Sequence, residues 1–138
     1  MSLERFLDAQ RDSYDTALAE LGAGDKRSHW MWFIFPQIAG LGQSPTARFY
    51  AIRDLAEARA YLAHPLLNAR LAACVAAMLG HAGQRSAEAI LGGIDAVKLR
   101  SSCTLFEAAG GAAGFGQCLD AFFGGARDAA TLRLIESD

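Results

Sequence analysis

The sequence contains only three cysteines and three prolines, and the cysteines do not form a recognisable site. Cys74, Cys103 and Cys118 include no C-x-x-C pair and no zinc-ligand spacing. Scattered cysteines in odd number are typical of reduced thiols, so we predict three free thiols and a cytoplasmic location. The three histidines also lack the spacing of a metal site, and we expect neither a metal ion nor a cofactor.

Long apolar runs and an excess of positive charge are missing as well. No apolar segment approaches the ~20 residues of a membrane-spanning helix, and the N-terminal residues do not resemble a signal peptide. The formal net charge is −2, with two lysines against eleven arginines. Nucleic-acid-binding domains usually carry a basic face, so we expect neither nucleic acid nor a membrane as a partner.

Alternation of apolar and polar residues, the mark of a half-buried strand, is absent too. Apolar spacings of three and four residues instead predict amphipathic helices, the longest over Leu3–Leu21 and Leu66–Leu79. We predict an all-α fold: a compact multihelical single domain, residues 1–138, with about seven helices. Five side chains are suited to cap helix N-termini: Ser44, Asp54, Ser86, Asp95 and Asp128.

The sequence is organised around an aromatic segment, residues 26–50, in which seven consecutive apolar residues run from Trp30 to Pro36. A short helix that begins after Ser28 and ends before Pro36 is favoured over a buried strand. A buried aromatic side chain removes roughly 150–250 Å² from water, so this segment should dominate the core. The expected core residues are Phe33, Ile34, Leu71, Val75, Leu119 and Phe122.

Four segments together resemble a bacterial family of unknown function whose members are often mislabelled calpastatin-like. They are residues 26–44, containing HWMWFIFPQ and GLGQS, and residues 57–65, 95–106 and 122–132. The resemblance covers nearly the whole chain and implies a compact multihelical domain without an assigned activity. Cys103 stands where a methionine is usual after two serines, which argues against a catalytic thiol.

The aromatic segment contains the first group of candidate site residues. His29 is suited to move a proton, since histidine titrates near neutral pH. Trp30 and Trp32 can stack on a planar ring, with Trp30 the first choice, and Gln37 can orient a ligand. Core packing is the favoured alternative for the aromatic residues. The two tryptophans are two residues apart, however, so one of them should face a cleft if the segment is helical.

A second group lies on the predicted helix over residues 95–106. At helical spacing, Lys98, Ser101 and Ser102 share a face, and an ammonium with two hydroxyls suits a phosphate or carboxylate. The alternative is purely structural. In that case Asp95 pairs with Lys98, and the serines donate hydrogen bonds to carbonyl groups of their own helix.

Two functions remain open on the sequence alone. The first is a small-molecule site for a planar anionic ligand, such as a nucleotide or an ADP-ribose-like metabolite, with hydrolysis as an extension. The second is a non-enzymatic protein-interaction module in which the aromatic segment is core and an exposed apolar patch binds an unidentified protein. Convergence of the two residue groups on one concave surface would favour the first.

Overall fold

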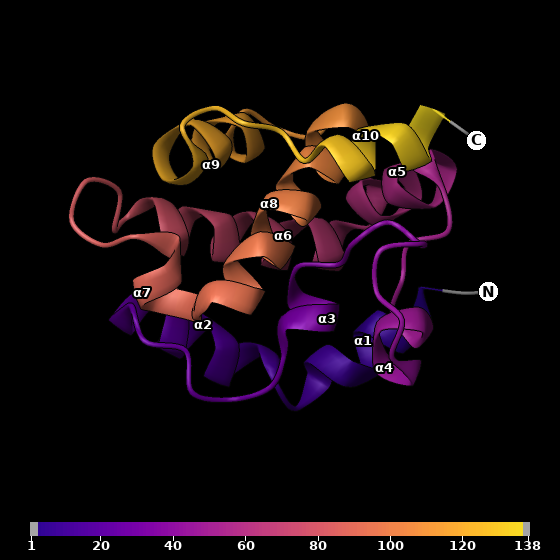
Figure 1. Cartoon of the computed structure of the whole chain (residues 1–138). Coiled ribbons are helices and arrows are strands. Elements are labelled where there is room, and N and C mark those ends of the chain that lie inside the picture. The colour runs from indigo at the N-terminus through magenta and orange to yellow at the C-terminus, as the bar shows by residue number, and fades with distance from the viewer. Residues whose placement is uncertain (1–2, 137–138) are drawn as a thin grey trace.

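The computed structural model describes residues 3–136, which form ten helices around a single hydrophobic core. The all-α prediction is confirmed, although the described residues contain ten helices and not about seven. In Figure 1, α8 crosses the middle of the molecule, with α1, α2 and α3 below it and α9 and α10 above it. The helices are α1 (Glu4–Arg11), α2 (Tyr14–Ala23), α3 (Met31–Ile34), α4 (Pro45–Phe49), α5 (Leu55–Ala63), α6 (Pro65–Leu79), α7 (Ala87–Leu91), α8 (Gly93–Ala108), α9 (Gly114–Phe123) and α10 (Ala129–Glu136).

Several helix starts follow directly from local sequence. Ser44, Asp54 and Ser86 cap α4, α5 and α7 by accepting hydrogen bonds from backbone N–H groups three residues later, as predicted. Proline occupies the first position of α4 and of α6, where its missing N–H costs no helical hydrogen bond. These signals are local, and they place the helix starts without reference to the rest of the fold.

The predicted N-terminal helix, Leu3–Leu21, is wrong as a single element. The chain bends at Asp12 and Ser13, so α1 ends at Arg11 and α2 begins at Tyr14. The bend gives the two halves different packing partners, because α1 lies against α3 and α2 lies against α6. One straight helix could not cover both surfaces.

Two predicted caps are also wrong. Ser28 does not cap α3, because the N-cap of α3 is Trp30. The Ser28 hydroxyl instead donates to the Glu20 carboxylate at 2.7 Å. Asp95 lies inside the first turn of α8, too late in the chain to cap it, and forms ion pairs instead. The N-cap of α8 is Gly92, whose φ of 89° is a conformation that favours glycine.

The core is centred on α8, which packs against α5, α7, α9 and α10. Five of the six predicted core residues are buried, whereas Phe122 is only partly buried at the edge of the core. The aromatic segment contributes Trp30, Met31, Phe33, Ile34 and Phe35 to the core. Cys74, Cys103 and Cys118 are buried free thiols.

Extended structure is confined to one contact in the described part of the chain. An isolated parallel bridge joins Ile38 to Ile52, with hydrogen bonds of 2.8 Å from Ala39 N–H to the Ile52 carbonyl and from Ile52 N–H to the Gln37 carbonyl. This bridge holds the segment after α3 against the segment after α4. Within residues 3–136, no single helix is both long and apolar enough to cross a membrane, although α5 and α6, bent by 93°, reach that length and composition jointly.

Candidate functional site

The two tryptophans occupy opposite environments although only one residue separates them. Trp30 is 1% exposed, and its indole Nε1 donates to Glu20 Oε1 at 2.9 Å. Trp32 is partly exposed and lines several surface hollows. Trp30 is therefore a core residue and is not accessible for stacking, although it is among the residues that line a hollow with Ser28 and His29. Trp32 is the more exposed tryptophan.

Glu20, on α2, fixes the loop that leads into the tryptophans. Its carboxylate accepts hydrogen bonds from the backbone N–H groups of Arg27 and Ser28, the Ser28 hydroxyl and the Trp30 indole. Partial burial raises the pKa of Glu20, but these hydrogen bonds outweigh burial and lower it to about 2. The ionised carboxylate thus holds Trp30 inward, which leaves Trp32 on the outer side of α3.

The chain's two lysines lie over its two tryptophans. Lys26 Nζ is 5.0 Å from the Trp30 ring centroid, and Lys98 Nζ is 4.8 Å from the Trp32 ring centroid. Both distances are within the range of cation–π attraction. Asp95 joins the two lysines, with its carboxylate 2.9 Å from Lys26 Nζ and 3.5 Å from Lys98 Nζ. The predicted structural pairing of Asp95 with Lys98 is therefore present, but Lys26 is the nearer partner.

Three hollows surround Trp32 and Lys98, and we refer to this surface as the Trp32 face. The α8 hollow, about 330 Å³, contains Lys26, His29, Trp32 and the N-terminal residues of α8. The α4 hollow, about 580 Å³, contains His29, Trp32, Phe49 and Tyr50. The α10 hollow, also about 330 Å³, is lined by Gln37, Leu41, Gly42, Val97, Lys98, Ser101, Asp128 and Ala130.

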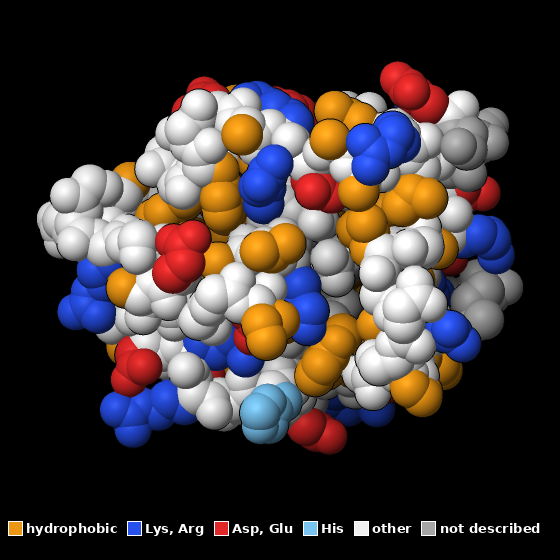
Figure 2. All heavy atoms as spheres, viewed as in Figure 1, with side chains coloured by type: hydrophobic (Ala, Val, Ile, Leu, Met, Phe, Trp, Pro, Cys, Tyr) orange, Lys and Arg blue, Asp and Glu red, His pale blue; other side chains and the backbone are white. Residues whose placement is uncertain are grey.

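The hollows share lining residues. Trp32 lines the α8 hollow, the α4 hollow and a small crevice, and that crevice shares Gln37 and Gly42 with the α10 hollow. A Cβ atom at Gly42 would clash with Ala47 beside this crevice, so glycine is required there. Figure 2 shows hydrophobic and basic side chains intermixed on the surface where α3 and α8 meet. The Trp32 face thus combines aromatic, aliphatic and cationic groups.

The predicted Lys98, Ser101 and Ser102 cluster is not a single exposed surface. Ser101 is 2% exposed, and its hydroxyl is 3.2 Å from both the Val97 carbonyl and the Asp128 carboxylate. Ser102 is 1% exposed, and its Oγ has no hydrogen-bond partner among the described residues. Because α8 is covered on several sides, Ser102 faces the core and is not accessible to a ligand. Lys98 and Ser101 remain at the α10 hollow.

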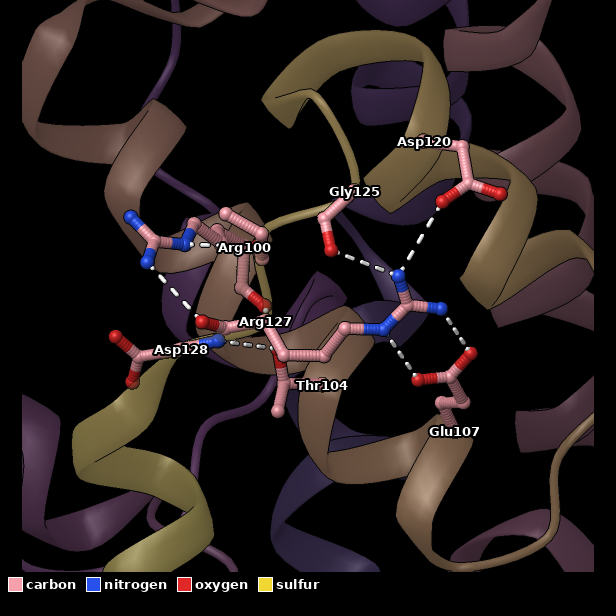
Figure 3. A network of polar contacts seen from close by, with 8 residues as sticks. Arg100, Thr104, Glu107, Asp120, Gly125, Arg127 and Asp128 are labelled. Atoms are coloured by element: carbon pink, nitrogen blue, oxygen red, sulfur yellow. Dashed lines mark hydrogen bonds and ion pairs between the residues drawn. The ribbon is translucent and has the colours of Figure 1, made fainter.

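The turn between α9 and α10, which precedes Asp128, is held by two arginines (Figure 3). Arg127 donates to Glu107 at 2.9 and 2.6 Å, to Asp120 at 3.2 Å and to the Gly125 carbonyl at 2.9 Å. Arg100 donates to the carbonyls of residues 126 and 127, both at 3.1 Å. Together they fix the turn between α9 and α10, and therefore the position of Asp128, which is next in the chain.

Asp128 connects this turn to the hollow. Its N–H donates to Thr104 Oγ1 at 3.0 Å, and its carboxylate accepts the Thr131 N–H at 3.0 Å, which confirms it as a capping residue of α10. Because the same carboxylate lies beside Ser101, the α10 hollow has an acidic side as well as the Lys98 ammonium. An anionic group would therefore lie nearer Lys98 than Asp128.

His29 and Trp32 line the α8 and α4 hollows, and Gln37, Lys98 and Ser101 line the α10 hollow, whereas Trp30 and Ser102 are each 1% exposed. Sequence reasoning missed Lys26, Asp95 as a partner of Lys26, and Phe49 of the α4 hollow. The scarcity of lysine was an available signal for Lys26, because both lysines lie in the segments that carry the family resemblance. No sequence signal indicates that Phe49 is 55% exposed.

The site residues contain no arrangement typical of a metal centre. Within residues 3–136, no three His, Cys, Asp or Glu side chains lie close enough to hold a metal ion together. His29 is exposed and forms no hydrogen bond within the described residues, so no carboxylate there orients its imidazole. The surface has the groups to bind a ligand, whereas a preorganised catalytic group is not among the described residues of this face.

Comparison with known proteins adds a family and a solved structure. Residues 1–135 match the sequence profile of a family described as "Protein of unknown function (DUF1810)". The fold is similar to the crystal structure of the conserved hypothetical protein Rv1873 from Mycobacterium tuberculosis, with a TM-score of 0.93 and 45% sequence identity. That similarity covers 97% of this chain and 96% of the other. No curated protein matches the sequence.

Proposed function

Since the chain belongs to the DUF1810 family, whose function is unknown, we propose from its geometry that the Trp32 face binds a small planar anionic ligand. The expected class is a nucleotide or an ADP-ribose-like metabolite. The observation that carries this proposal is the position of the Lys98 ammonium, which lines the α10 hollow and lies 4.8 Å from the ring centroid of Trp32, a residue of the α4 hollow.

Aromatic rings support the planar part of the ligand. Trp32, Phe49 and Tyr50 contribute to the α4 hollow, whose volume of about 580 Å³ lies within the range of small-molecule sites, roughly 300–1,000 Å³. The Phe49 and Tyr50 rings meet edge to face with centroids 4.8 Å apart, and Tyr50 also contacts Phe33 of the core. A rigid aromatic wall of this kind favours stacking of a flat ring.

The anionic part of the ligand is placed by charge. Lys98 is the lysine at the α10 hollow, and its side chain is 22% exposed, so its ammonium is accessible. The amide of Gln37 lies in the same hollow and in the crevice beside Trp32, where it can hydrogen-bond a ring or ribose group. A ligand that spans the Trp32 ring can contact the α4 hollow and Lys98 at once.

The proposal extends to hydrolysis of the bound ligand, in which His29 would transfer a proton. His29 lines the same two hollows as Trp32 and is the titratable side chain best placed to transfer a proton to or from a bound ligand. Since its imidazole has no orienting partner among the described residues, we expect binding to be the main activity and any turnover to be slow. His29→Gln should remove turnover and leave affinity within about twofold, since glutamine keeps a hydrogen-bonding side chain at this position but cannot transfer a proton.

A protein-interaction module is the second candidate, and exposed apolar side chains favour it. Ile94 is 77% exposed, Val97 58% and Phe49 55%, and all three border the Trp32 face. Exposed apolar residues grouped in this way often mark a binding surface. In that case Ile94→Ala and Val97→Ala should weaken the complex more than Lys98→Met does.

Titration calorimetry with AMP, ADP-ribose and uncharged adenosine tests the proposal. We expect saturable binding of the anionic compounds, weaker binding of adenosine, and at least about a tenfold loss for Trp32→Ala and for Lys98→Met. Arg59→Met is the matched control, because Arg59 is exposed on α5, outside the three hollows, and its loss changes the net charge equally. Failure of all three compounds to bind the wild-type protein, or equal losses in the control, would contradict the proposal.

A further inference from the structure

Asp95 is shared unequally by the two lysines. Its Oδ2 atom is 2.9 Å from Lys26 Nζ, whereas its Oδ1 atom is 3.5 Å from Lys98 Nζ. The Lys26 side chain is 8% exposed and the Lys98 side chain 22%. The shorter, more buried contact has the stronger electrostatic interaction, because solvent screens it less. Asp95 is therefore neutralised mainly by Lys26.

Lys26 is held in place independently of Lys98. Its backbone N–H donates to the Ile90 carbonyl at 2.8 Å, which ties it to the end of α7. Its ammonium lies over the buried Trp30 ring, and Trp30 is in turn fixed by Glu20. A buried ammonium held in this way needs a carboxylate partner, and Asp95 is the one that the described structure provides.

This arrangement leaves Lys98 with capacity for another partner. An ammonium has three N–H donors, and Lys98 has one long contact to Asp95 and a cation–π contact to Trp32. Two ammonium groups and one carboxylate leave this cluster with a net positive charge. Without Lys26, Asp95 and Lys98 would form a neutral pair, and the carboxylate would compete directly with an incoming anion for the Lys98 ammonium.

We propose that Lys26 is a positioning residue for anion recognition: by neutralising Asp95, it leaves the Lys98 ammonium available to the ligand. Lys26 acts through Asp95 and does not contact the anion. This inference rests on the proposed function, because its affinity test requires that the protein binds an anionic ligand. The pairing of Lys98 with Asp95 in the ligand-free protein tests it separately.

The affinity test is a double-mutant cycle measured by calorimetry with AMP. Lys26→Met should weaken binding about tenfold, as expected for loss of a unit charge near a partly exposed site. Asp95→Asn should strengthen binding, and adding Lys26→Met to Asp95→Asn should change the affinity by less than about threefold, because no carboxylate is then left for Lys26 to neutralise. Lys98→Met should weaken binding at least about tenfold in every background, because Lys98 is the group that meets the anion.

The cycle distinguishes a positioning role from a simple charge effect. If Lys26 attracted the anion only by its own charge, its removal would weaken binding by the same factor in the wild-type and Asp95→Asn backgrounds; that result would overturn the proposal. The double variant also replaces both buried charges, so it remains informative if Lys26→Met alone proves unstable. Far-ultraviolet circular dichroism of each variant establishes that it is folded.

Lysine ammonium NMR spectra of the ligand-free protein provide a readout that does not depend on any ligand. With two lysines in the sequence, each side-chain signal is assigned by one substitution. We expect Lys26→Met to slow exchange of the Lys98 ammonium protons with water, because Asp95 then pairs with Lys98, and Asp95→Asn to remove that effect. An unchanged Lys98 signal in Lys26→Met contradicts the inference, whereas a wild-type protein that binds no AMP contradicts only the proposed function.

Discussion

Arg5 and Glu57 form a buried ion pair between α1 and α5, with Arg5 Nη2 3.0 Å from Glu57 Oε1 and both side chains at most 5% exposed. Arg5 also donates to the carbonyls of Phe49 and Ala51, at 2.9 and 2.8 Å. The pair therefore anchors the segment after α4 to the first helix. Since Phe49 ends α4 and Tyr50 follows it, Arg5 also supports the aromatic wall of the α4 hollow.

Removing one partner of this pair should be costly. We expect Glu57→Gln to lower the free energy of unfolding by about 3–5 kcal/mol, because it removes one charge of a buried ion pair. Arg11→Met is the control, since Arg11 and Asp8 form an ion pair with side chains 69% and 62% exposed. Exposed pairs contribute less than about 1 kcal/mol. If urea denaturation gives the two variants equal losses of unfolding free energy, the buried pair contributes no more to stability than the exposed one.

The core role of the aromatic segment can be tested at Phe33. Phe33 is 9% exposed and contacts the Tyr50 ring, with centroids 5.2 Å apart. Phe33→Ala should lower the unfolding free energy by about 3–5 kcal/mol, the range for a truncated buried phenylalanine. Phe49→Ala, at a residue 55% exposed, should cost much less. Similar losses for the two variants, measured by chemical denaturation, would mean that this segment is not the centre of the core.

Glu20 should make stability depend on pH in the acidic range. Its pKa in the fold is about 2, below the ordinary value of 4.5, so the folded protein favours the ionised form. The stabilisation is complete above the unfolded pKa of 4.5 and is lost as the pH falls from there toward about 2. We expect the stability difference between wild type and Glu20→Gln to be largest near neutral pH and to shrink through this range.

The control for Glu20 is Glu88→Gln, because Glu88 lies exposed in the first turn of α7. Its effect on stability should be small across the whole pH range. Urea denaturation at several pH values compares the three proteins. A stability difference at Glu20 that stays constant from neutral pH to the lowest pH would contradict the assignment of an ionised carboxylate that accepts four hydrogen bonds.

The three thiols should be unreactive in the folded protein. Burial raises the pKa of Cys74 to about 12, and a hydrogen bond with Cys118 together with burial raises the pKa of Cys103. Thiolates are the reactive species, so we expect negligible labelling by a disulfide reagent at about pH 8. Three thiols should react once the chain is unfolded in guanidinium. Rapid labelling of any thiol in the native state would contradict this prediction.

Much of the fold could be predicted because its signals are local. The caps at Ser44, Asp54 and Ser86 depend on a side chain and an N–H group three residues away, and Pro65 begins α6 by its own geometry. The division of α1 from α2 could not be predicted in this way. It depends on where α3 and α6 lie, and the three-four apolar spacing continues through the bend.

The candidate site was only partly predictable for the same reason. His29, Trp32, Gln37 and Lys98 were predicted as site residues from residue type alone, and they line the hollows of the Trp32 face. That Trp32, and not Trp30, is the more exposed tryptophan could not be predicted. Spacing on a short helix shows that two nearby positions differ, but it does not show which one a distant carboxylate such as Glu20 holds inward.

The sequence by itself determined the all-α class, most helix starts and the aromatic centre of the core, since these depend on contacts within one or two helical turns. Only the tertiary structure decided that Ser102 is buried, that Lys98 reaches Trp32, and that Asp95 pairs with Lys26. Lys26 and Asp95 lie far apart in the sequence, one before α3 and the other in α8. Their pairing exists only because α8 packs across the loop before α3, and no local pattern encodes that contact.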